Sequence, residues 1–110
     1  MANADDFRRI ALSFPGTEEK AHMGHPDFRV GGRIFATLHP PGSGIGVVML
    51  LPEQQELAME AEPGAFEPAA GAWGRGGSTL VELEKVPDDW LERVLEWAWR
   101  KRAPAKLREG

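Results

Sequence analysis

The sequence contains no cysteine, and this absence excludes disulfide bonds, thiol nucleophiles and cysteine-ligated metals. Its apolar runs all fall short of the roughly 20 residues that a membrane-spanning helix needs. The chain does not open with the charged and then apolar stretch that is typical of a secretory signal. We therefore expect a cytoplasmic protein that does not associate with membranes.

Positive charge is also scarce. The 110 residues include 13 Lys and Arg against 17 Asp and Glu, which leaves a formal net charge of −4. Non-specific binding to duplex DNA depends on cations that neutralise phosphates, so this balance argues against such a role. Five basic residues nevertheless lie between Arg100 and Gly110, opposed only by Glu109. This segment fits either an interaction arm or cations that complement the dipole at the end of a helix.

The remaining composition is that of a globular protein, with 42% hydrophobic and 27% charged residues, and the length fits one domain over residues 1–110. Apolar periodicity and capping residues predict helices over about 4–14, 52–62 and 87–103. The pattern predicts strands over about 17–23, 45–51 and 78–86, with a hairpin over 25–38 adding two more. This order predicts an α+β fold in two layers, with an antiparallel sheet of about five strands and helices packed on one face.

The hairpin between His25 and Leu38 turns at Gly31-Gly32, and two loop lengths are compatible with it. A two-residue loop pairs Val30 with Arg33 and mixes apolar and charged side chains on both faces. A three-residue loop with a glycine bulge pairs Arg29 with Arg33 instead. We favour the longer loop, because it separates apolar from charged side chains more cleanly.

In the favoured register, one face carries Phe28, Ile34, Ala36 and Leu38, and the other carries Arg29, Arg33, Phe35 and Thr37. The outer face would then present two guanidinium groups around an aromatic ring. The alternative is an ordinary solvated sheet face on which a loop covers Phe35.

Residues 65–77 have no stable periodicity and predict a loop. Its second half places Trp73 and Arg75 among glycines. Glycines at this density either let the backbone approach a partner closely or belong to a plain mobile loop. Neither a Gly-Lys-Ser/Thr motif nor a Rossmann-like spacing accompanies them, so a nucleotide-binding motif is not indicated.

Several segments in the same order resemble the MmcQ/YjbR family of small bacterial proteins, namely His25–Val30, Gly32–Leu38, Leu51–Gln55 and Gly71–Gly74. The resemblance covers nearly the whole chain. It implies a cytoplasmic bacterial protein with a CyaY-like fold and a DNA-binding label attached to a surface of basic strands and loops. The matching positions are His25, Phe28, Arg29, Arg33, Phe35, Thr37, Trp73 and Arg75. The chain departs from the family at Met49, where members often have lysine, and at Ala105-Lys106, where they have a denser basic pair.

Two functions fit these residues. In a nucleic-acid-binding module, the arginines would contact phosphates while Phe35 or Trp73 stacks on a base. The alternative is a small-ligand or protein-interaction domain that grips an anionic partner through the same face. For either function, the predicted binding residues are His25, Arg29, Arg33, Phe35, Trp73 and Arg75.

Catalysis is not indicated. His22, His25 and His39 are the three histidines, and the first two are spaced so that they could approach a metal or act as acid and base. No HExxH motif, serine elbow or compact acid-base-nucleophile set accompanies them. We expect no catalytic residue, no metal and no cofactor, and we expect a monomer.

Overall fold

The computed structural model describes residues 2–40 and 42–108. The helices are α1 (Ala4–Leu12), α2 (Pro52–Ala61), α3 (Gly71–Arg75), α4 (Asp88–Arg102) and α5 (Ala105–Arg108). The strands are β1 (Thr17–His22), β2 (His25–Val30), β3 (Arg33–Leu38), β4 (Ile45–Met49), β5 (Phe66–Pro68) and β6 (Ser78–Glu82).

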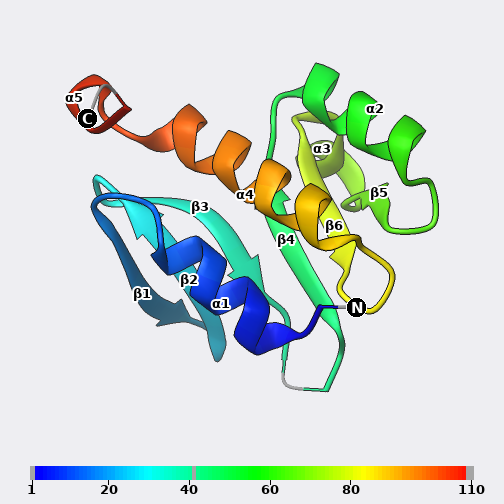
Figure 1. Ribbon diagram of the computed structural model, residues 1–110, viewed down its shortest axis with the longest axis horizontal. Helices are drawn as coiled ribbons and strands as arrows, with labels where there is room; N and C mark the ends of the chain where they lie inside the picture. The colour runs from blue at the N-terminus through cyan, green and yellow to red at the C-terminus, as the bar shows by residue number, and fades with distance from the viewer. Residues whose placement is uncertain (1, 41, 109–110) are drawn as a thin grey trace.

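The strands form one antiparallel sheet in the order β1-β2-β3-β4-β6-β5. Helices α1 and α4 lie across the same face of this sheet, with α2 beside α4 (Figure 1). The predicted α+β fold is therefore confirmed. The sheet has six strands because the short β5 adds to the five that the pattern predicts.

The core lies between the sheet and the two long helices. Helix α1 begins with a capping box in which Asn3 and Asp6 exchange hydrogen bonds at 2.9 and 3.1 Å. Its apolar stripe packs onto the sheet, where the ring centroids of Phe7 and Phe28 are 5.8 Å apart. The fully buried stripe of α4 consists of Leu91, Val94, Leu95 and Ala98. Within the described residues, no helix is both long and apolar enough to cross a bilayer.

The central hairpin has the register that we did not favour. Val30 pairs with Arg33 across a two-residue turn, and both turn glycines have positive φ, +60° at Gly31 and +79° at Gly32. Such a turn matches the twist of the flanking strands. The extra residue lies instead in β3, where Arg29 pairs with Ile34 but Phe28 pairs with Ala36.

This bulge reverses the predicted orientation of Phe35. Phe28 and Ala36 face the helices, and Phe35 is also fully buried in the core cluster. The predicted outward orientation of Phe35 and inward orientation of Ile34 are therefore wrong. The physical reason is that a bulge shifts the alternation of side chains by one residue wherever it occurs, and here it occurs within the strand.

The stretch that we predicted to be a loop contains β5 and α3. These elements are three and five residues long, too short to produce a recognisable period. Tertiary contacts fix them instead. The buried Gln55 side chain of α2 donates to the carbonyl oxygens of Gly74 (3.1 Å) and Ser78 (3.2 Å) and to Oγ1 of Thr79 (3.1 Å).

Gly74 lies where the structure leaves no room for a side chain. A Cβ atom at this position would overlap the carbonyl group of Ala69. The close backbone approach that the glycines permit is therefore made to the chain itself, and it sets the position of α3.

We predict that Gly74→Ala lowers the free energy of unfolding by about 1–3 kcal/mol, because the added methyl group forces the backbone apart. Gly76→Ala is the matched control, since its methyl group would meet only ordinary contacts at 3.5–3.6 Å. Urea unfolding of both variants measures the difference. Equal stability of the two variants would contradict this account of α3.

Candidate binding groove on the open sheet face

The face of the sheet opposite α1 and α4 carries a mixed set of side chains. Ala36, Val48 and Val81 point into the core, so Thr37, Val47 and Leu80, which adjoin them away from the bulge, point to the other face. Thr37 pairs with Val47 there, and Val47 pairs with Leu80. The centre of this open face is therefore largely apolar.

Two adjoining hollows cross the open face and share His22, Thr37, Met49 and Trp73. The first, which we call the basic hollow, has a volume of about 520 Å³ and is completed by Arg29, Gly32, Arg33, Ile34 and Arg102. The second, the apolar hollow, has a volume of about 510 Å³ and is completed by His39, Val47, Ala69, Ala70, Ser78 and Leu80. Together they form one groove that is cationic at one end and apolar at the other.

Trp73 stands between the two hollows. It lies on α3, and 74% of its surface is exposed. Burial of a large apolar side chain lowers the free energy of the protein. An exposed tryptophan beside a hollow is therefore typical of a binding surface. The residue therefore offers a free aromatic face at the point where the cationic and apolar ends meet.

A buried carboxylate, Asp27, holds two of the side chains that line the basic hollow. Asp27 is fully buried and accepts hydrogen bonds from Nε (2.8 Å) and Nη2 (3.1 Å) of Arg29. Nδ1 of His22 lies 2.7 Å from Oδ2, the Asp27 oxygen that also accepts from Nη2 of Arg29. The bonds from Arg29, and to a lesser extent those from His22, hold the pKa of Asp27 below its ordinary value despite the opposing effect of burial. Arg29 is thus oriented by Asp27 rather than free.

The histidines gather at one end of the same face. His22 pairs directly with His25 across the first hairpin, and their ring centroids are 6.2 Å apart. The ring of His39 lies 6.0 Å from that of His25. Among the residues that the structure describes, no group of three or more His, Cys, Asp or Glu side chains is arranged to hold a metal ion.

The groove contains three of the six predicted binding residues, namely Arg29, Arg33 and Trp73. His25 lines neither hollow, but its ring lies beside the rings of His22 and His39, which do. Arg75 lies at the C-terminal end of α3 and lines neither hollow. Phe35 is buried in the core and cannot stack on a ligand, which corrects that prediction.

Arg102 is the main cation lining the groove that the sequence pattern did not single out. It is the last residue of α4 and reaches the basic hollow from the helical layer. The basic run near the C-terminus was a signal for it, but the pattern could not tell which of those cations faces the sheet. The neighbouring Lys101 donates to the carbonyl oxygen of Leu50 at 3.1 Å, and burial lowers its pKa.

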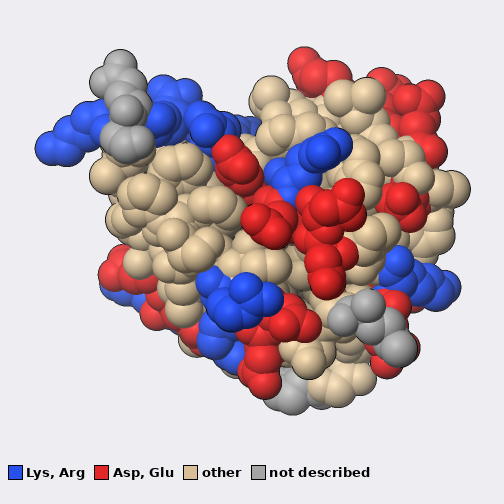
Figure 2. All heavy atoms as spheres, in the orientation of Figure 1, with Lys and Arg blue, Asp and Glu red and all other residues tan. Residues whose placement is uncertain are grey.

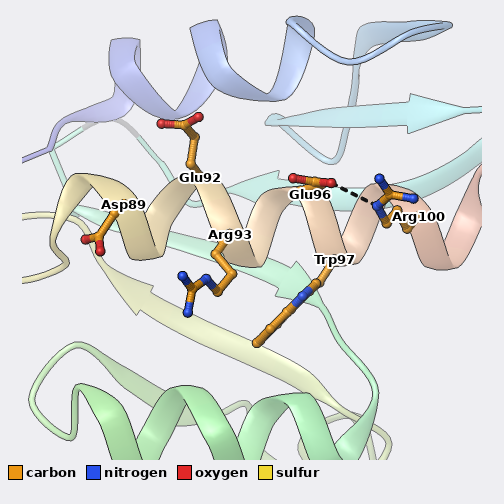
Figure 3. A pocket seen from close by; sticks show the side chains of 6 residues that line it. All are labelled: Asp89, Glu92, Arg93, Glu96, Trp97 and Arg100. Atoms are coloured by element: carbon orange, nitrogen blue, oxygen red, sulfur yellow. Dashed lines mark hydrogen bonds and ion pairs between the residues drawn. The ribbon is translucent and has the colours of Figure 1, made fainter. Parts of the chain in front are cut away.

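A further hollow of about 410 Å³ lies on the helical face and is lined by α4 alone (Figure 3). Its three carboxylates, Asp89, Glu92 and Glu96, outnumber its two guanidinium groups. Glu96 also pairs with Arg100 at 2.8 Å, as the dashed line in Figure 3 marks. This surface is therefore less suited to an anion than the groove on the open face.

Fold and groove together define a small α+β protein in which helices cover one face of an antiparallel sheet and the other face carries a partly cationic, partly apolar groove. The family model described as YjbR matches residues 12–101. The chain belongs to the YjbR family, and the predicted resemblance is confirmed.

The fold is similar to the crystal structure of Deinococcus radiodurans protein DR2400, a DUF419 domain. The TM-score is 0.79 at 20% sequence identity, over 99% of this chain and 87% of that chain. A search of curated proteins finds no match.

We predict that Asp27→Asn lowers the free energy of unfolding at neutral pH by about 1–3 kcal/mol, because the buried negative charge is lost and an NH2 donor replaces one of the two acceptor oxygens. Asp5→Asn is the control, since the Asp5 side chain is 91% exposed and its ion pair lies at the surface. Urea unfolding between about pH 7 and pH 2 measures both variants.

The pH dependence has a defined direction. Because the pKa of Asp27 is lower in the folded state, its contribution is complete above the unfolded-state pKa of about 3.9. It is lost as the pH falls through the folded-state pKa. The difference between the wild-type protein and Asp27→Asn should therefore shrink in acid, and an unchanged difference would contradict this role.

Proposed function

We propose that the groove on the open face binds single-stranded nucleic acid, with arginines on phosphates and Trp73 stacked on a base. The observation that carries this proposal is the position of an exposed tryptophan between a cationic hollow and an apolar one. Proteins that bind single strands combine a positively charged groove with aromatic side chains on which bases stack.

The distribution of charge supports an anionic partner even though the net charge is negative. Among the described residues, neither hollow has an Asp or Glu in its lining. Acidic side chains gather instead over the middle of α4 on the helical face (Figure 2). An anion on the open face is therefore on the opposite side of the molecule from these carboxylates, and distance and mobile ions in solvent weaken their repulsion.

A single strand suits the groove better than a duplex. Duplex binding relies on many phosphate contacts spread over a broad cationic surface. The groove offers only Arg29, Arg33 and Arg102, next to an apolar floor. An unpaired base has a free aromatic face to place on Trp73, whereas the faces of bases in a duplex are already stacked.

The second candidate is a small anionic ligand. The apolar hollow supports it, because its volume of about 510 Å³ lies within the range of small-molecule sites. The same arginines would then bind the carboxylate or phosphate of that ligand. Failure of single-stranded oligonucleotides to bind, together with a hit in a thermal-shift screen of anionic metabolites, would favour this candidate.

We predict that Trp73→Ala weakens binding to a single-stranded oligonucleotide about 5- to 150-fold, the equivalent of roughly 1–3 kcal/mol per stacked base. Fluorescence polarisation with a labelled oligonucleotide measures the change. Leu57→Ala removes another exposed apolar side chain, on α2, and should leave the affinity unchanged. Equal effects of the two substitutions would contradict a stacking role for Trp73.

We also predict that affinity falls with salt, because each phosphate contact releases counterions. Two or three contacts give a slope of about −1.5 to −2 in a plot of log K against log salt concentration. Arg33→Ala should make this slope shallower. Arg9→Ala removes an exposed cation from α1 and should not change it. A slope near zero for the wild-type protein would overturn the proposed function.

A further inference from the structure

Two guanidinium groups in the basic hollow are free to bind an anion. Arg33 comes from the start of β3 and Arg102 from the end of α4, so the sheet and the helical layer each contribute one. Among the described residues, neither makes a salt bridge. Arg29 is the third guanidinium group, but Asp27 already accepts two of its hydrogen bonds.

Arg102 has a donor that lacks a partner. Its Nε atom is buried and makes no hydrogen bond within the described residues. A buried donor without an acceptor costs free energy, so such groups in native proteins usually meet a water molecule, an ion or a ligand. Because this Nε atom is closed to solvent, an acceptor oxygen in the basic hollow would reach it only if the Arg102 side chain moved.

The number of free cations indicates the kind of phosphate. An internal phosphodiester carries one negative charge, whereas a phosphate monoester carries about −1.5 to −2 at neutral pH. Two unpaired guanidinium groups therefore match a monoester. Guanidinium groups also present donors in a planar fork that fits phosphate oxygens.

The aromatic platform lies on only one side of this hollow. Trp73 and His22 line it where it meets the apolar hollow, and its other lining residues are not aromatic. A strand that continued in both directions would have a stacking surface for one neighbouring base only. A nucleotide at the end of a strand needs no more than that.

We infer that the basic hollow binds a phosphate monoester attached to a nucleoside whose base lies on Trp73. This inference rests on the proposed function and narrows it. The monoester belongs either to the phosphorylated end of a single strand or to a free nucleoside monophosphate. The two sources share one chemistry, and the experiment separates them.

The experiment compares deoxythymidine oligonucleotides of about eight nucleotides that carry a 5′-phosphate, a 3′-phosphate or hydroxyl groups at both ends. Fluorescence polarisation gives the affinity of the full chain for each, and thymidine monophosphate serves as a competitor. We expect one of the phosphorylated ends to bind at least about tenfold more tightly than the unphosphorylated strand, as an extra charge-assisted contact implies.

Substitutions then assign the preference to the hollow. Arg102→Gln should abolish the preference for the phosphorylated end, and Arg102→Lys should restore only part of it, because lysine keeps the charge but not the fork. Arg108→Gln, in the exposed α5, is the matched control and should retain the full preference. Thermal unfolding of each variant confirms that it folds.

Each outcome decides a separate point. Equal affinity for all three oligonucleotides overturns this inference and leaves the proposed function standing. Binding of thymidine monophosphate without binding of any oligonucleotide supports the monoester site and overturns the single-strand function. No binding of any probe overturns both. A full preference in Arg102→Gln overturns the assignment to this hollow.

Discussion

The arrangement of both sheet faces depends on one extra residue in β3. Ile34 faces outward opposite Arg29, Ala36 faces inward opposite Phe28, and Phe35 between them is buried. Without this bulge, strict alternation would put either Ile34 or Ala36 on the wrong face. The bulge thus lets a tight two-residue turn coexist with a continuous apolar core, and it leaves Arg29 and Thr37 together on the open face.

The same bulge marks the limit of what the sequence could predict. The long helices were predictable from local patterns. The Asn3 cap and the apolar stripe indicated α1, and the regular spacing of apolar residues indicated α4. The hairpin was also predictable from Gly31-Gly32. The position of the extra residue was not, because an inserted residue in the turn and one in the strand produce similar patterns. Its true position depends on packing against the helices.

Short elements, and contacts between residues far apart in the sequence, could not be predicted for a different reason. Helix α3 is held by Gln55, which is 19 positions away from its Gly74 partner, and by a close approach to Ala69. Neither contact leaves a local pattern. Arg102 belonged to an evident basic run, yet only the packing of α4 on the sheet determines that this cation faces the hollow. Asp27 and Arg29 are closer to predictable, since residues two apart on a strand share a face.

The net charge of the chain did not indicate the local charge of the groove. A formal charge of −4 is a sum over all surfaces, and here the carboxylates of α4 lie on the helical face. The carboxylate nearest the basic hollow, Asp27, is buried and bonded to Arg29 and His22. Glu18 lies opposite Arg29 on β1 and, with Asp27, offsets the charge of that arginine, so the cationic end of the groove depends on Arg33 and Arg102.

The amide of Gln55 joins the two layers of the protein through one side chain. It rises from α2 and holds the backbone of Gly74, next to the tryptophan that borders the groove. By linkage, a ligand that binds Trp73 more tightly when α3 is in place also favours the bonded arrangement of this amide. Slower amide exchange in α2, on the side remote from the ligand, would be the signature of an occupied groove.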